Sequence, residues 1–263
     1  MINSIPPIPR VRSNSIIQFP ISKHYLGLAF ALVAGFSASA FAQGPGDAVS
    51  VDPEVHHVIL DNDYIRVFDA RASKGTKSPM HSHPPFVVVS VGKSRFRMTL
   101  PDGKVSILDL NPGQVLWLEG ARHSWELLAG ELHVIGVEIK SAQKEGPPPA
   151  APQRKANDSV AADPEAHHVL FENPHVRVYE GRTSHGRTSP MHSHPPTVLV
   201  SLDWMRLKLT LPDGKTNIHD FSQGQVLWLP EGGTHSWQAL AGSGRVIAIE
   251  VKAAQAAMNK GQQ

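Results

Sequence analysis

The residue types most suited to chemistry are histidines that recur in one pattern along the chain. His81 and His83 flank a single serine, and His192 and His194 repeat that arrangement 111 residues later. Side chains two residues apart on an extended strand point to the same side, so each pair can offer two imidazoles to one metal ion. A third histidine, within a His-Ser-Trp triplet, follows in each copy. Each copy therefore offers three histidines as candidate metal ligands. They are His81, His83 and His123, and His192, His194 and His235.

The histidine pattern is part of a tandem duplication. The tetrapeptide Pro-Asp-Gly-Lys at 101–104 returns at 212–215, with the same spacing from the histidine pairs. Self-similarity at a fixed period indicates duplicated structural units. We therefore expect two domains, which span residues 49–140 and 162–252.

The remaining segments have the composition of a linker, a tail and a leader. Residues 141–161 join the two domains and contain a proline-rich run, which favours an extended linker, and 253–263 form a C-terminal tail. Residues 1–42 combine a cationic start, an apolar stretch and a final Ala-Phe-Ala, which is the pattern of a cleaved signal peptide. The apolar stretch is too short to span a bilayer readily. We therefore expect a secreted protein with no stable membrane anchor, periplasmic in a Gram-negative cell, with an uncleaved anchor as the alternative.

The composition excludes several classes of protein. The chain has no cysteine, so any metal must be held by histidine, carboxylate or water rather than by thiolate. The formal net charge of +2 includes three leader cations, Arg10, Arg12 and Lys23, and becomes −1 without them. The sequence contains no clustered basic stripe, so nucleic acid is not an expected partner.

Each copy has the pattern of short β-strands separated by turns. The segment 95–100 alternates polar and apolar residues, as a half-buried strand does, and the following Pro-Asp-Gly-Lys indicates a tight turn with glycine at positive φ. Many short strands at regular spacing predict an all-β sandwich or barrel. The strands expected in the first copy are 57–60, 65–72, 86–91, 95–100, 105–110, 115–118, 124–127 and 133–140.

Glycine and proline also have regular spacing around the histidines. Gly75 and Gly186 precede the histidine pairs with five residues between, and Pro230 and Gly232 precede His235. In these residues the chain resembles the cupin superfamily, whose motifs are Gly-x5-His-x-His-x3–4-Glu-x6-Gly and Gly-x5-Pro-x-Gly-x2-His-x3-Asn. The resemblance covers both copies and implies a bicupin, with two tandem barrels of the double-stranded β-helix, jelly-roll-like type. It further implies an internal pseudo-dimer and is compatible with a homo-oligomer. Small single-domain cupins associated with beta-alanine degradation are similar locally.

The chain departs from the cupin motifs at the carboxylate. Val87, Val88, Val198 and Leu199 occupy the positions where the motif glutamate would fall. The resemblance then implies one divalent metal per barrel, held by three neutral imidazoles that leave its 2+ charge and further positions open. Such a site favours a small anionic or chelating molecule as its ligand. Histidine ligands are compatible with Fe, Mn, Ni, Cu or Zn and do not select among them.

The resemblance implies a non-haem, metal-dependent oxidoreductase of dioxygenase type as one function. The alternatives are a non-catalytic module that binds metal or a small ligand, and a metal-free structural bicupin. No acid–base residue is evident beside the histidines, so no catalytic residue is assigned. Trp125 and Trp237 lie two positions after the third histidines and share their strand face, which makes them candidates for the pocket wall, with core packing as the alternative.

Two further groups of residues have simpler expected roles. The pairs His56-His57 and His167-His168 are expected at strand edges or interfaces, with support of the metal ligands as the alternative. Four arginines are expected on solvated strand faces, with a clamp for a carboxylate as the alternative. They are Arg66, Arg71, Arg177 and Arg182.

Overall fold

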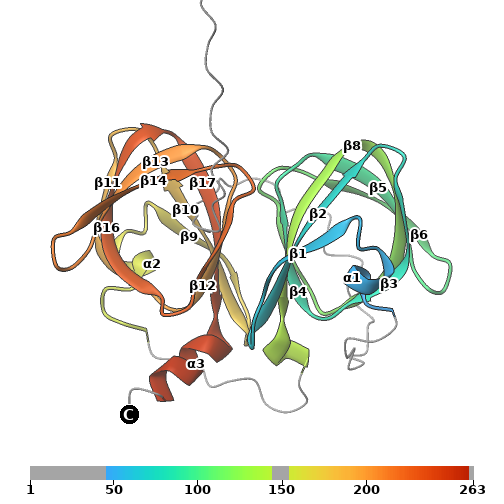
Figure 1. Cartoon of the computed structure of the whole chain (residues 1–263), viewed down its shortest axis with the longest axis horizontal. Helices are drawn as coiled ribbons and strands as arrows, with labels where there is room; N and C mark the ends of the chain where they lie inside the picture. Colours follow the sequence, from blue (N-terminus) through green and yellow to red (C-terminus); the bar gives the residue numbers. More distant parts are fainter. Residues whose placement is uncertain (1–45, 144–153, 261–263) are drawn as a thin grey trace, which may run out of the picture.

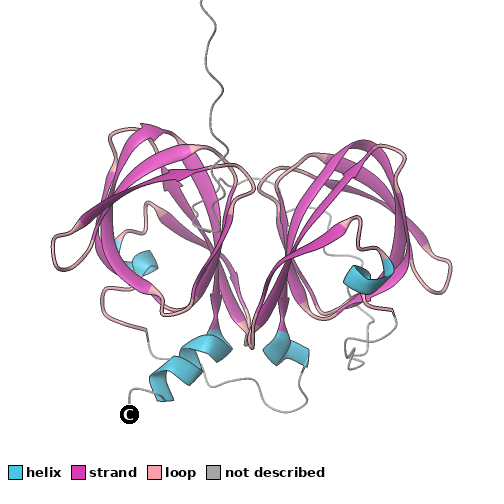
Figure 2. Cartoon of the chain, viewed as in Figure 1, coloured by secondary structure: helices cyan, strands magenta, loops and turns pink. Residues whose placement is uncertain are grey.

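The protein forms two β-barrels that lie side by side (Figure 1), in a computed structural model that describes residues 46–143 and 154–260. Strands make up most of both barrels and the helices are short (Figure 2), which confirms the all-β prediction. The predicted signal peptide, residues 1–42, lies outside the described residues, as does part of the predicted linker.

The first barrel, on the right in Figure 1, begins with a short helix and ends with a 3-10 turn. Its elements are α1 (Ala48–Val51), β1 (His56–Asp61), β2 (Ile65–Ser73), β3 (Lys77–His83), β4 (Phe86–Ser90), β5 (Ser94–Thr99), β6 (Val105–Leu110), β7 (Val115–Leu118), β8 (Ala121–Ile139) and η2 (Lys140–Gln143).

The second barrel, on the left in Figure 1, repeats this order, with two strands in place of β8 and a longer final helix. Its elements are α2 (Ser159–Ala162), β9 (His167–Glu172), β10 (Val176–Thr183), β11 (Thr188–His194), β12 (Thr197–Ser201), β13 (Met205–Thr210), β14 (Thr216–Phe221), β15 (Val226–Leu229), β16 (Gly233–Gly242), β17 (Gly244–Val251) and α3 (Lys252–Lys260). No helix in the described part of the chain is long and apolar enough to span a membrane.

Two antiparallel sheets form each barrel. In the second barrel their strand orders are β15-β12-β17-β10-β9 and β11-β16-β13-β14. In the first barrel β8 takes part in both sheets, because its first part pairs with β3 and β5 and its last part with β2 and β4. The prediction of two separate strands, 124–127 and 133–140, is therefore wrong for this barrel. Gly130, at φ 75°, lies where this strand passes from one sheet to the other.

The hairpins β5–β6 and β13–β14 confirm the predicted glycine turns. Gly103 and Gly214 have φ values of 83° and 82°, a region that residues with a side chain rarely adopt. The strand before each turn buries alternate residues, as the sequence pattern indicated.

The barrels meet through one apolar cluster that contains residues of both copies. Strands β4 and β12 are buried along their whole length, because each has the barrel interior on one side and this cluster on the other. Val87 and Val198 lie in the cluster, whereas Val88 belongs to the interior of the first barrel. At its margin, the ring of Trp117 stacks on His175 of the second barrel, with 6.1 Å between centroids.

Candidate metal centres

The predicted histidines of the first barrel lie together inside it. His81 and His123 face each other in the antiparallel pairing of β3 with β8, and their ring centroids are 4.6 Å apart. His83, two residues along β3, points to the same side, and its ring lies 5.0 Å from that of His81 and 5.6 Å from that of His123. All three side chains are buried.

The second barrel repeats this arrangement. His192 and His235 face each other between β11 and β16, with 4.8 Å between ring centroids. The ring of His194 lies 4.8 Å from that of His192 and 5.2 Å from that of His235. The ligand atoms of these three side chains all lie within 4.8 Å of one another, which is compatible with one metal ion.

A fourth histidine joins each group, from the first residue of β1 or β9. The ring of His56 lies 4.9 Å from that of His81, and the ring of His167 lies 4.9 Å from that of His192. The ligand atoms of His56, His81 and His83 also lie within 4.8 Å of one another. His56 and His167 do begin edge strands, as expected, but their side chains are buried beside the histidine groups, which favours the alternative of a role next to the metal ligands. Their recurrence in both copies was the available signal, but the cupin motifs assign no ligand to that strand.

Hydrogen bonds at Nδ1 orient several of these rings. The Nδ1 of His81 lies 2.8 Å from the carbonyl oxygen of Pro79, and the Nδ1 of His56 lies 3.1 Å from that of Asp52. A carbonyl oxygen only accepts, so Nδ1 carries the proton and Nε2 keeps the lone pair that a metal ligand requires. The second barrel repeats both bonds, from His192 to Pro190 at 2.8 Å and from His167 to Asp163 at 3.0 Å.

Burial keeps the imidazoles neutral. Desolvation, followed by the neighbouring His81, lowers the pKa of His56 to about 4. Desolvation likewise lowers the pKa of His167 to about 4 and that of His235 to about 3, with His192 as the next cause in both cases. Neutral imidazole is the form that binds metal, so the rings need not lose a proton to bind at neutral pH.

The Nε2 atoms provide the test of whether a metal fits. In the described residues, the buried Nε2 atoms of His81, His192 and His235 have no hydrogen-bond partner. A buried polar atom without a partner costs about 1–3 kcal/mol, and a bound cation would remove that cost. Since these atoms sit in compact groups of neutral imidazoles, the residues present fit a divalent metal in each barrel.

The motif carboxylate is replaced by apolar side chains that face the same interior. Val88 packs in the interior cluster of the first barrel and Leu199 in that of the second. Trp125 and Trp237, the candidates for the pocket wall, are 8% and 4% exposed and pack in the interior clusters of their barrels. On the side that faces the barrel interior, the histidine groups therefore have apolar surroundings.

Two of the four arginines are buried behind the histidine groups, so their expected position on a solvated face is wrong. Arg66 donates from Nε to Glu138 at 2.5 Å and also pairs with Asp47. The strand pairing explains the position, because Arg66 on β2 and Glu138 on β8 are direct partners. Arg71 and Arg182 remain accessible to solvent, over 56% and 35% of their side chains.

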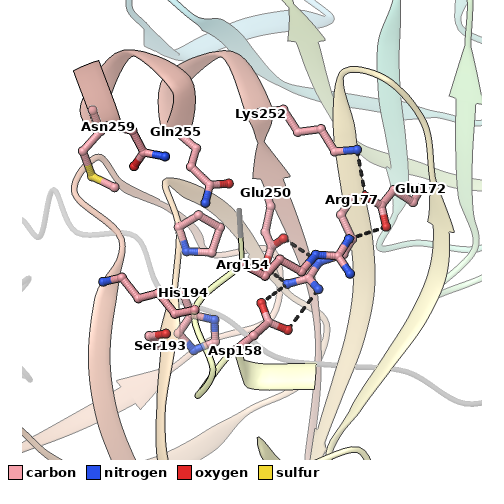
Figure 3. A pocket seen from close by; sticks show the side chains of 13 residues that line it. Arg154, Asp158, Glu172, Arg177, Ser193, His194, Glu250, Lys252, Gln255 and Asn259 are labelled. Atoms are coloured by element: carbon pink, nitrogen blue, oxygen red, sulfur yellow. Dashed lines mark hydrogen bonds and ion pairs between the residues drawn. The ribbon is translucent and has the colours of Figure 1, made fainter. Parts of the chain in front are cut away.

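Arg177 forms the equivalent ion pairs in the second barrel. It donates from Nε to Glu250 at 2.6 Å and from Nη1 to Asp158 at 3.0 Å. Figure 3 shows this cluster beside His194, at the wall of a cavity of about 300 Å³ that extends to α3. The cavity reaches His194 of the second histidine group, and most of the side chains that line it are charged or amide side chains.

Comparisons with known proteins found similar structures but no matching sequence. No protein-family model and no curated protein sequence matches the chain. AerE from Microcystis aeruginosa is similar in structure, with 12% identity, a TM-score of 0.50, and coverage of 75% of this chain and 97% of that one. A cupin 2 conserved barrel domain protein from Leptotrichia buccalis aligns at 17% identity and a TM-score of 0.45, over 75% and 88% of the two chains. An oxalate decarboxylase variant from Bacillus subtilis aligns at 12% identity and a TM-score of 0.46, over 72% and 69%.

At these identities the similarity concerns the fold alone. The spacing of the histidine motifs and the two antiparallel barrels identify the fold as that of a cupin, present twice in one chain. Each barrel contains a buried histidine group suited to a divalent metal.

Proposed function

We propose that this protein is an exported bicupin that binds one divalent transition-metal ion in each barrel and acts there on a small anionic or chelating molecule. One observation carries the proposal. In each barrel, buried imidazoles converge with their ligand atoms within 4.8 Å of one another, although the carboxylate of the cupin motif is missing.

All four histidines of each barrel are the proposed ligands. Because imidazole is neutral, the 2+ charge of the ion is not reduced by its protein ligands. On an ion that takes more than four ligands, such as Fe, Mn or Ni, these side chains would leave room for a small chelating anion. The ligands are His56, His81, His83 and His123 in the first barrel, and His167, His192, His194 and His235 in the second.

A metal in this position would supply Lewis acidity, and a redox-active one could support dioxygenase chemistry. The chain itself supplies orientation and a dry environment. Phe68 and Phe86 both stack against His83, at 5.3 and 4.7 Å between centroids, and Val88 packs in the same cluster. Exclusion of water by these apolar groups strengthens the attraction between a bound anion and a cation.

A non-catalytic metal-binding module is the second candidate, and the carboxylates favour it. The buried Glu138 and Glu250 are both engaged by arginine, so neither is placed as a free acid or base. Reaction assays distinguish the two candidates. The metal-loaded protein is incubated with small carboxylic acids and diketones while oxygen consumption and product formation are recorded.

Metal-dependent turnover that is lost in a His81→Ala/His192→Ala variant would support the enzyme. Stoichiometric metal binding with no turnover of any compound in the panel would support the module. A protein that binds no metal would contradict both candidates.

Export is tested separately. The chain is expressed in full in a Gram-negative host, and the periplasmic fraction is examined for a protein whose N-terminus is Gln43. Retention of the leader in the cytoplasmic fraction would contradict export and leave the metal sites unaffected.

A further inference from the structure

The second histidine of each pair has a different hydrogen-bond partner in the two barrels. The Nδ1 of His83 lies 3.3 Å from Oε1 of Glu138. The Nδ1 of His194 lies 2.7 Å from the hydroxyl oxygen of Tyr179. Both histidines belong to the metal-binding groups, and their rings occupy equivalent places in the two barrels. The hydrogen-bond partner of Nδ1 nevertheless differs between them.

The difference arises from a matched pair of substitutions between the copies. Phe68 and Ala48 of the first barrel correspond to Tyr179 and Ser159 of the second. The Tyr179 hydroxyl lies 2.7 Å from His194 and 3.4 Å from the Ser159 hydroxyl. Phenylalanine and alanine can form neither bond. The second barrel therefore has two buried hydroxyl groups where the first has apolar side chains.

The buried carboxylate is present in both barrels but is used differently. Glu138 accepts from Arg66 at Oε2, at 2.5 Å, and faces His83 with Oε1. Glu250 accepts from Arg177 at both oxygens, at 2.6 Å each (Figure 3). The carboxylate thus bridges arginine and histidine in the first barrel and forms a two-point contact with arginine in the second.

The surroundings of His83 increase the effect of its charged partner. The ring stacks against both Phe68 and Phe86, whereas Thr197 replaces Phe86 in the second barrel. Thr197 donates its hydroxyl to the carbonyl oxygen of Pro195 at 2.6 Å. A hydrogen bond to a charged group is stronger in an apolar environment than in a polar one.

We propose that the two metal centres are inequivalent, with Glu138 and Tyr179 as the positioning residues that make them so. The proposal rests on the proposed function, because it requires that both barrels bind metal. A carboxylate draws the Nδ1 proton more strongly than a phenol does, which leaves more electron density on Nε2. His83 is therefore the stronger metal donor, and the first barrel is the tighter site.

The expected difference in metal affinity follows from the effect of hydrogen-bond partners on ligand histidines in known metal sites. Loss of a partner behind a ligand typically lowers metal affinity by about 10–100-fold. Exchange of a carboxylate for a phenol weakens that partner without removing it. We therefore expect the first barrel to bind about tenfold more tightly.

Electron paramagnetic resonance of Cu(II) separates the two sites. The metal-free mature protein is titrated with Cu(II) alone, and spectra are recorded up to two equivalents. We expect two sets of copper signals that appear in sequence. The first set should be retained in His192→Ala and lost in His81→Ala.

Two matched variants test the role of the carboxylate. Glu138→Gln and Glu250→Gln each disturb a buried ion pair with arginine. Only Glu138→Gln also removes the charge from the residue that is hydrogen-bonded to a histidine of the metal group. Glu138→Gln should shift the copper signals of the first barrel and lower its affinity by about tenfold. Glu250→Gln should leave the signals of the second barrel unchanged.

The exchange of the hydroxyl pair gives an independent test. Tyr179→Phe with Ser159→Ala gives the second barrel the side chains of the first and adds no volume, so it stays informative if Glu138→Gln does not fold. The second set of signals should shift, and the first should not.

Four results would overturn the inequivalence while leaving two metal sites in place. They are coincident signals that fill together, tighter binding in the second barrel, equal effects of the two glutamine variants, and no spectral effect of the hydroxyl exchange. Absence of copper binding in either barrel would instead contradict the proposed function itself.

Discussion

Replacement of Arg177 by methionine tests the energetics of the buried ion pairs beside the second histidine group. The arginine is 1% exposed and forms hydrogen bonds to both Asp158 and Glu250. Methionine retains a flexible apolar side chain but removes the positive charge. Two carboxylates would then remain buried together without a cation, unless they take up protons or the barrel opens to water.

The expected cost follows from this burial. Removal of one partner from a buried ion pair typically costs about 3–5 kcal/mol, because the other charge is left without compensation. For a chain of this size each kcal/mol lowers the Tm by about 2–4 °C. Arg177→Met should therefore lower the Tm by roughly 6–20 °C.

Circular dichroism during thermal and urea unfolding provides the measurement, with Arg71→Met as the control. Arg71 also pairs with an aspartate, Asp69, but 56% of its side chain is exposed, so its loss should cost at most about 1 kcal/mol. Arg177→Met combined with Asp158→Asn and Glu250→Gln should recover part of the loss, because no uncompensated charge remains. A loss in Arg177→Met no greater than that in Arg71→Met would refute the reasoning.

Three other predictions concern the metal groups. His56→Ala should weaken metal binding in the first barrel, measured by competition with a chelator, whereas His57→Ala at the exposed neighbour should not. Equal metal affinity in the two variants would contradict the role of His56 as a fourth ligand. The stability of the metal-free protein should fall as the pH is lowered, because the pKa of His56 is about 4 in the folded state and 6.5 in the unfolded state. The contribution of His56 to stability is complete above pH 6.5 and is lost as the pH falls toward 4. A urea midpoint that does not change over this pH range would contradict the prediction. Gly232→Ala should be more destabilising than Gly214→Ala, as judged by urea unfolding. Both glycines have positive φ, which costs about 1 kcal/mol for alanine, but only at Gly232 would the new Cβ lie 2.0 Å from the carbonyl oxygen of His194; equal costs would refute this steric account.

The sequence pattern was sufficient to predict the fold class and to mark most members of each histidine group. The repeated His-x-His and His-Ser-Trp segments marked residues that the pairing of β3 with β8, and of β11 with β16, brings together. Strand alternation and the Pro-Asp-Gly-Lys turns identified two hairpins, whose glycines have the expected positive φ.

The fourth histidine could not be assigned because its role depends on closure of the barrel. His56 begins an edge strand, and the sequence alone places its side chain equally well toward solvent. Only the curvature of the sheet brings its ring to 4.9 Å from that of His81, while the next residue, His57, is exposed.

The buried arginines were wrongly predicted for a related reason. Arg66 lies in a strand with a mixed pattern, and nothing local indicates that Glu138, 72 residues away, is its direct partner. Charged residues are rarely buried unless they are paired, and the pairing is a long-range property of the sheet.

Elemental analysis of the mature protein, purified without a metal-binding tag, tests the central claim most directly. The account predicts two equivalents of a divalent transition metal per chain after reconstitution. It predicts one equivalent in His81→Ala or His192→Ala, and none when both substitutions are combined. Absence of metal from the folded wild-type protein, or an unchanged content in the double variant, would contradict the assignment of these histidine groups as metal sites.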